Sequence, residues 1–377
     1  MRRGLGLVAA LTLVAPSVRG WLYRGGVRIT RARTRTRTRM SSSHAPAIDV
    51  EELWPHLAGK QTSANDAAGK VIREAWAKDE YHLKNKDQTN QYGVGDSSSS
   101  SSSSLSWNIR RSVVDYKDDG GTALQGLYAR PEGEGLPDRL PGVVLAHTAV
   151  GPQEDIILWK LDAIARLGYA AFALDMFGTG AALWNRAQSL AARRPITEDR
   201  SLMQARAMAA VKTLGQMEEV DQERLAAVGY CFGGMAVLDI ARMAMARPDA
   251  DGEDDTSALP RLKAVASLHG ILAPISPGAG GGCKVADDAP IGVPRVLVLH
   301  ATADPFVPPE QVQAMEAEFL RRGANLEVVR YGGEALHAFT RPEKTLKADK
   351  DAGLCYCKHA DEDAWRRVVD LLREELS

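Results

Sequence analysis

The sequence predicts an α/β fold with a mainly parallel central sheet and helices on both of its faces. Short continuous apolar runs alternate with longer segments of helical spacing along the C-terminal part of the chain. Such runs are typical of strands that are buried on both faces. The repeated strand–helix–strand order favours parallel pairing. About 270 residues follow a serine run at 97–104, which is a sufficient length for one domain of this kind.

The composition is that of a globular protein, and it excludes several other classes. The chain has 377 residues, of which 45% are hydrophobic and 25% charged. Four cysteines are too few for a disulfide scaffold, and no run of 18 apolar residues predicts a transmembrane helix. Residues 49–377 carry 37 basic and 48 acidic groups, which argues against nucleic-acid binding as the main function.

Residues 1–48 form a leader with ten arginines, no lysine and no acidic residue. Arg2 and Arg3 precede an apolar run over 5–18, which has the length of a signal-peptide core and is too short to span a bilayer. The stretch that follows is rich in Arg, Thr and Ser, as in organelle transit peptides. The combination resembles the two-part leaders of algae with complex plastids, so we expect a disordered, plastid-targeting leader. A mitochondrial leader, a cytoplasmic protein whose leader does not function, and an arm that binds nucleic acid are the alternatives.

Residues 49–104 form a variable polar segment between the leader and the main domain. Scattered Trp and Tyr residues are its apolar anchors, and residues 71–78 have the spacing of a short amphipathic helix. The sequence leaves open whether this segment packs on the main domain. Its last eight residues, 97–104, are all serine, which predicts a flexible linker. We therefore place the main domain at residues 105–377.

Eight strands and five helices are predicted within this domain. The predicted strands cover Trp107–Tyr116, Leu124–Ala129, Val143–Ala146, Ala170–Leu174, Leu225–Val228, Ala264–Leu268, Val296–Leu299 and Leu326–Tyr331. The predicted helices cover Ile156–Leu167, Thr197–Leu214, Gly233–Ala246, Glu310–Arg322 and Asp361–Leu376. Gly168 and Gly323 end two of these helices, because glycine readily adopts the left-handed conformation that follows a helix.

The segment from Gly229 to Gly234 has the pattern of a nucleophile elbow, with Cys231 where serine is commoner. It lies between a predicted strand and a predicted helix, and small residues at Gly229 and Gly233 let these two elements approach closely. The dipole of the following helix favours the thiolate of Cys231, and the free N–H of Phe232 can bind an oxyanion. A buried, inert cysteine in a tight turn is the alternative interpretation.

Asp304 and His337 each follow a later predicted strand. The chain order of nucleophile, acid and histidine is that of the α/β-hydrolase fold. Loops that follow parallel strands meet at one edge of the sheet, so we expect Cys231, Asp304 and His337 to converge there. The alternatives are a turn or helix-cap role for Asp304 and a surface position for His337.

Three motifs together resemble the dienelactone hydrolase family over about residues 105–377. They are Gly-Tyr-Cys-Phe-Gly-Gly at 229–234, His-Ala-Thr-Ala-Asp-Pro-Phe-Val-Pro-Pro at 300–309, and His-Ala-Phe-Thr-Arg-Pro at 337–342. The resemblance implies the α/β-hydrolase fold and the cleavage of a lactone or ester without a cofactor. The site residues that it implies are Cys231 as nucleophile, Asp304 as acid, His337 as base, the N–H groups of Phe232 and Ala149 as the oxyanion hole, and Arg341 as the partner of a substrate carboxylate.

One position departs from the family pattern. The lactone-cleaving members carry a glutamate at the position of Thr148, where it helps control the ionisation of the cysteine. Threonine can form a hydrogen bond but cannot hold a proton as a carboxylate does, so Thr148 is a substrate-binding candidate only. Glu154 is expected to open the next helix, where an acid is favoured. The family's second substrate arginine falls in a stretch with four candidates, Arg186, Arg193, Arg194 and Arg200.

Other polar residues give weaker signals, and we expect no metal and no cofactor. Cys355 and Cys357 have the wrong spacing for a redox or zinc pair. Cys283 follows a glycine run that does not join a strand to a helix, which argues against a phosphate loop. His147 and His269 end predicted strands, and each is expected to be a structural or pocket-lining histidine rather than a metal ligand.

The sequence therefore predicts a hydrolase that cleaves a small-molecule ester or lactone through a thioester acyl-enzyme on Cys231. The alternatives are a carboxylesterase or thioesterase with another acyl substrate, and a non-catalytic binding or redox-sensing protein on the same fold. The sequence does not indicate an oligomeric state.

Overall fold

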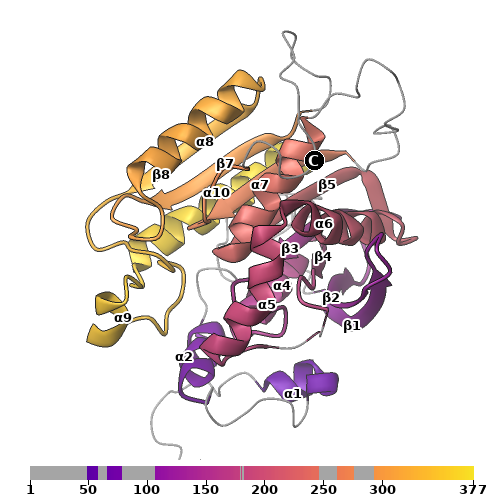
Figure 1. Ribbon diagram of the computed structural model, residues 1–377. Coiled ribbons are helices and arrows are strands. Elements are labelled where there is room, and N and C mark those ends of the chain that lie inside the picture. The colour runs from indigo at the N-terminus through magenta and orange to yellow at the C-terminus, as the bar shows by residue number, and fades with distance from the viewer. Residues whose placement is uncertain are drawn as a thin grey trace, which may run out of the picture. The chain divides into compact units, whose positions relative to one another are not determined.

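The computed structural model describes residues 49–57, 66–78, 107–178, 180, 182–245, 261–275 and 293–377. The leader over 1–48, the serine run and Cys283 lie outside these residues. Within them, eight strands form one sheet (Figure 1). The strands are β1 (Asn108–Lys117), β2 (Ala123–Glu132), β3 (Leu140–Ala146), β4 (Ala170–Ala173), β5 (Val220–Tyr230), β6 (Leu262–Leu268), β7 (Arg295–Ala301) and β8 (Asn325–Tyr331).

The sheet is mainly parallel, as the sequence predicts. Its strand order is β1-β2-β4-β3-β5-β6-β7-β8. β2 runs antiparallel to both of its neighbours, and all pairs from β4 to β8 are parallel. The carboxyl ends of β3 to β8 therefore lie along one edge, and the loops that leave this edge carry the predicted site residues.

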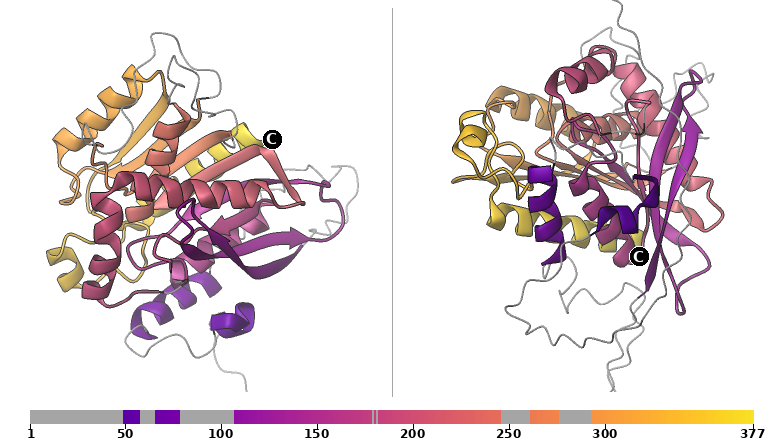
Figure 2. Two further views of the ribbon diagram at one scale, coloured as in Figure 1. Left: turned by 45° about the vertical axis from the view of Figure 1, so that its right-hand side comes forward. Right: turned by 90° about the horizontal axis from the view of Figure 1, so that it is seen from below.

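Helices cover both faces of the sheet (Figure 2). Those of the main domain are α4 (Asp155–Arg166), α5 (Arg186–Glu198), α6 (Arg200–Gly215), α7 (Phe232–Ala244), α8 (Pro309–Arg321), α9 (Lys347–Asp351) and α10 (Lys358–Leu376). α4 and α10 pack on one face, while α6 and α7 pack on the other.

The prediction of one long helix over Thr197–Leu214 is wrong at its start. Two helices, α5 and α6, meet at Asp199, which has extended backbone angles and accepts hydrogen bonds from the first N–H groups of α6. α5 is hard to recognise from the sequence because it is mostly polar. It buries only Ser189 and Ile196, so it has no regular apolar stripe.

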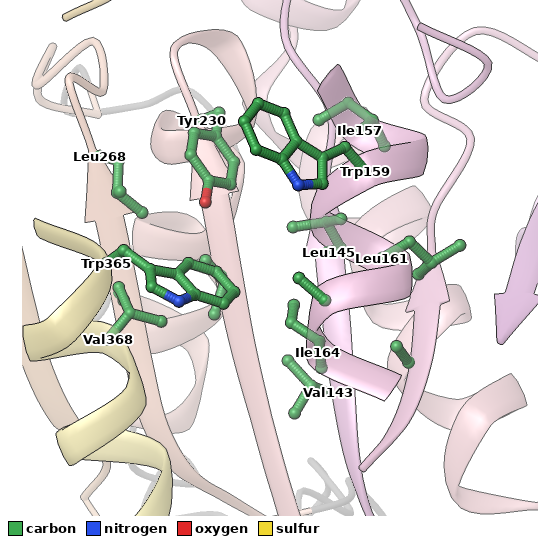
Figure 3. Close-up of a cluster of buried hydrophobic side chains, with 14 of the residues drawn as sticks. Val143, Leu145, Ile157, Trp159, Leu161, Ile164, Tyr230, Leu268, Trp365 and Val368 are labelled. Carbon is green, nitrogen blue, oxygen red and sulfur yellow. The ribbon is translucent and has the colours of Figure 1, made fainter. Parts of the chain in front are cut away.

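Successive side chains of a strand point to opposite faces of the sheet, and this divides the core into two clusters, one on each face. Figure 3 shows part of the cluster under α4 and α10, which contains Trp159 of α4, Trp365 of α10 and strand residues such as Val143 and Leu145. The second cluster lies under α6 and α7 and includes the neighbours of these strand residues, such as Val144. This burial fixes the strand register, and with it the height at which each loop leaves the sheet.

The sequence left open whether residues 49–104 pack on the main domain, and the described part of this segment does so. It forms α1 (Val50–Leu53), a 3-10 turn at Pro55–Leu57 and α2 (Asp66–Ala77). Trp54 and Trp76 are buried in the cluster that includes α4, and Arg73 forms an ion pair of 3.1 Å with Asp155. Among the described residues, no helix is long and apolar enough to cross a membrane.

Candidate active site

Cys231 lies in a tight turn between β5 and α7, as the elbow motif predicts. Its backbone has φ 55° and ψ −113°, a conformation that is costly for a residue with a side chain. A Cβ on Gly229 would lie 2.2 Å from the carbonyl oxygen of Gly233, and a Cβ on Gly233 would lie 2.2 Å from that of Ala146. Both positions therefore require glycine.

Backbone strain is concentrated at this edge of the sheet. Among the described residues, the non-glycine residues with positive φ are Cys231, His269 and Ala338. Cys231 directly follows β5, His269 directly follows β6, and Ala338 directly follows His337. Strained backbone of this kind persists only where the surrounding structure enforces it, and it tends to occur at functional sites.

The structure brings Cys231, His337 and Asp304 together in one hydrogen-bonded chain. His337 Nε2 lies 3.0 Å from Cys231 Sγ, and His337 Nδ1 lies 2.7 Å from Asp304 Oδ2. The other carboxylate oxygen of Asp304 accepts a 2.8 Å hydrogen bond from the N–H of Phe306. His337 and Asp304 are buried, and Cys231 is partly exposed, so Cys231 is the most exposed residue of the three.

The electrostatics of this chain favour a thiolate beside an imidazolium. Burial alone would raise the pKa of Cys231, but the charge of His337, its hydrogen bond and that of the Phe232 N–H outweigh burial and lower it. Burial likewise opposes the charged form of His337, but Cys231 and Asp304 raise the pKa of His337 to about 10. Cys231 also lies at the N-terminus of α7, where the helix dipole stabilises an anion.

The oxyanion-hole candidates Phe232 and Ala149 lie at the start of α7 and in the loop after β3. His147 Nε2 accepts from the N–H of Met176 at 3.1 Å, so His147 Nδ1 carries the proton and donates to the Thr148 carbonyl at 2.6 Å. The N–H of Ala149 belongs to the same trans peptide group as this carbonyl and points the opposite way. His147 therefore fixes the orientation of the predicted oxyanion donor.

Arg341 and Thr148 lie together in a buried network with two glutamates, and the charge of Arg341 helps to lower the pKa of Cys231. Arg341 pairs with Glu154 through Nη2 and with Glu343 through Nε, the latter at 2.5 Å. The Thr148 hydroxyl donates to Glu154 at 2.5 Å and lies 3.4 Å from Arg341 Nη1. Burial raises the pKa of Glu154 more than Arg341 and Thr148 lower it.

The expectation for Glu154 needs a correction. It stands at the N-cap of α4, as predicted, but its side chain makes no capping hydrogen bond. Its carboxylate instead contacts Arg341 and Thr148, and a buried carboxylate without such partners would be strongly destabilising. The partners are far apart in the sequence, so no local pattern indicated this contact.

His269 and the pair Cys355 and Cys357 lie next to the loop that carries His337. His269 is buried, its pKa is held well below its usual value mainly by burial, and its Nε2 lies 2.9 Å from Thr340 Oγ1. Its ring stands edge-on to that of His337, with centroids 5.3 Å apart, so it packs against the catalytic candidate His337. Cys355 and Cys357 donate their backbone N–H groups to His337 and Phe339, at 3.1 and 3.0 Å, and so support the histidine loop.

Within the described residues, none of the four candidates for the second substrate arginine forms a hydrogen bond or an ion pair with this network. Arg200 is buried and forms an ion pair of 2.5 Å with Asp239 on α7, and Arg194 pairs with Glu198 within α5. Within the residues that the structure describes, no cluster of His, Cys, Asp and Glu could hold a metal ion.

The comparisons with known proteins agree with this fold. A model of the dienelactone hydrolase family matches residues 124–376. An uncharacterised protein of Caenorhabditis elegans is 31% identical over 180 residues, which are 48% of this chain and 98% of that protein. Two solved structures are each 30% identical and cover 71% of this chain and 99% of their own. They are m3DLH, with a TM-score of 0.59, and a dienelactone hydrolase-like promiscuous phosphotriesterase from metagenomic libraries, with a TM-score of 0.58.

Proposed function

Because this chain belongs to the dienelactone hydrolase family and is a hydrolase that acts on ester bonds, we propose that it cleaves a carboxylic ester or lactone with Cys231 as nucleophile. The observation that carries this proposal is the unbroken chain from Asp304 through His337 to Cys231. A structural cysteine would need no imidazole at 3.0 Å and no carboxylate behind it.

In the first half of the reaction, the Cys231 thiolate attacks the ester carbonyl carbon. The carbonyl oxygen becomes an oxyanion and accepts hydrogen bonds from the Phe232 and Ala149 N–H groups, and one such donor is worth about 3 kcal/mol in the transition state. The C–O bond then breaks, and the imidazolium of His337 gives its proton to the leaving oxygen. The products of this step are an alcohol and a thioester on Cys231. When the substrate is a lactone, the alcohol stays covalently joined to the acyl group of the thioester.

In the second half, neutral His337 takes a proton from a water molecule that attacks the thioester. Asp304 accepts the hydrogen bond from Nδ1 and stabilises the imidazolium that forms. The tetrahedral intermediate collapses, the C–S bond breaks, and the acid is released. The thiolate–imidazolium pair is then ready for another cycle.

The test is hydrolysis of an activated ester by the wild type and by Cys231→Ala, with Cys355→Ala as the matched control. We expect Cys231→Ala to lose the activity while keeping its circular-dichroism spectrum, and the control to retain it. A slow ester should leave an acyl group on Cys231 that mass spectrometry of the digested protein locates. Full activity of Cys231→Ala would contradict the proposal.

The same assay separates the candidate substrate classes. An oxygen ester, a lactone and a thioester of one acyl group present the same carbonyl to Cys231 and differ only in the leaving group. The highest kcat/KM among them assigns the class. Loss of all three activities together in Cys231→Ala would show that one site serves them.

A further inference from the structure

Arg341 is held by carboxylates on two sides. Its Nε donates to Glu343 at 2.5 Å, and its Nη2 pairs with Glu154. The side chains of Arg341, Glu154 and Glu343 are only 9%, 0% and 3% exposed. Thr148 lies 3.4 Å from the remaining nitrogen, Nη1. Each of the three guanidinium nitrogens therefore has a contact to a protein oxygen.

The charge balance points the same way. The single positive charge of Arg341 faces two glutamates, so the network offers no net positive charge to an anion. An incoming carboxylate would compete with Glu154 and Glu343 for Arg341, and a glutamate that lost this contact would remain buried without its cation. Leaving one member of a buried ion pair unpartnered is strongly destabilising.

Apolar side chains also lie in the cluster on which Cys231 packs. Ala149, Phe177 and Ile271 are half-buried and pack on the same cluster as Cys231. Phe306 is 47% exposed, and its ring lies edge-on to His337 with the centroids 5.0 Å apart. A group that leaves water here gains contacts with hydrocarbon and aromatic surface, while a carboxylate loses its hydration without a partner.

We propose that Glu154 and Glu343 fix Arg341 as an internal cation, so that the site accepts uncharged esters and discriminates against substrates with a carboxylate near the scissile carbonyl. The inference rests on the proposed function, because it concerns the substrate of Cys231. It assigns Glu154 and Glu343 as specificity-determining residues and gives Arg341 a role different from the one that the family resemblance implies.

Alkylation of Cys231 by iodoacetamide and by iodoacetate tests the charge preference without any turnover. The two reagents differ only in an amide or a carboxylate, and in both the thiolate displaces iodide. Each rate is divided by the rate for N-acetylcysteine at the same pH and ionic strength, and the product on Cys231 is followed by peptide mass. We expect the normalised rate to favour iodoacetamide about tenfold or more. A preference for iodoacetate would overturn the inference.

Charge removal supplies the second test. Glu343→Gln and Glu154→Gln each free donors of Arg341, and each should shift the ratio towards iodoacetate about tenfold. Glu132→Gln removes the same charge from the end of β2, at the opposite edge of the sheet, and should leave the ratio unchanged. Equal ratios in all three variants would overturn the inference. If a glutamine variant does not fold, the ratio of the two alkylation rates in the wild type still tests the inference.

The ester assay distinguishes this inference from the proposed function. The p-nitrophenyl esters of butyric acid and of succinic acid, the latter with one free carboxylate, have acyl chains of similar length. Wild-type hydrolysis of the butyrate with at least tenfold lower kcat/KM for the succinate supports both. Equal hydrolysis of the two, lost in Cys231→Ala, would overturn the inference and leave the proposed function standing. Activity that persists in Cys231→Ala would contradict the proposed function.

Discussion

Gly233→Ala should disable the site through the backbone alone. The added Cβ would lie 2.2 Å from the carbonyl oxygen of Ala146, whereas ordinary contacts begin near 3.4 Å. The end of β3 and the start of α7 must therefore separate by roughly 1.2 Å. Forcing a methyl group into a packed region costs about 1 to 3 kcal/mol of stability. A displacement of about 1 Å between reacting groups can lower the rate about 100-fold.

The assay is urea unfolding together with kcat/KM for an activated ester, with Gly332→Ala as the control. Gly332 also lies at the carboxyl edge of the sheet, but a Cβ there would have its nearest neighbour, Thr302 Oγ1, at 3.9 Å. We expect Gly233→Ala to lose both stability and activity, and Gly332→Ala to keep both. If Gly233→Ala unfolds and turns over like the wild type, the close approach of β3 and α7 does not hold the elbow in place.

Three other predictions test other parts of the account. Asp304→Asn should lower kcat by about two to four orders of magnitude with little change in the fold, because His337 loses the carboxylate that orients it; unchanged kcat would contradict its role. Trp76→Ala should destabilise the protein by about 3 kcal/mol in urea unfolding, while the exposed Val71→Ala on the same helix should change stability by less than about 0.5 kcal/mol; equal effects would show that α2 does not contribute to the core. We also propose that residues 1–48, fused to a fluorescent protein, carry it into the plastid of an alga with complex plastids; uniform cytosolic fluorescence would refute this.

The sequence predicts the strands well because buried parallel strands leave a local signal. Val143–Ala146 and Ala264–Leu268 are continuous apolar runs, and the structure has a strand at each. The predicted strand begins at Leu225, five residues after the start of β5, because Val220–Arg224 is mostly polar and partly exposed. The break between α5 and α6 was missed because it depends on one capping residue within a polar stretch.

The site is predictable to the extent that backbone geometry demands particular residues. The spacing of Gly229 and Gly233 indicates the elbow, since any side chain at either position would collide with backbone. The network around Arg341 has no such signal, because Thr148 and Arg341 are 193 positions apart. Glutamates are common on surfaces, and only the folded chain shows that Glu154 is completely buried.

The most direct test of the central claim is the pH dependence of Cys231 alkylation by iodoacetamide, followed by peptide mass. We expect the alkylation rate to rise at a lower pH than that of an ordinary thiol, because the charge of His337 and its hydrogen bond lower the pKa of Cys231. His337→Gln should move this rise to higher pH. A wild-type rate that instead rises with pH through about 8.5, the pKa of an ordinary thiol, would contradict the resting thiolate–imidazolium pair.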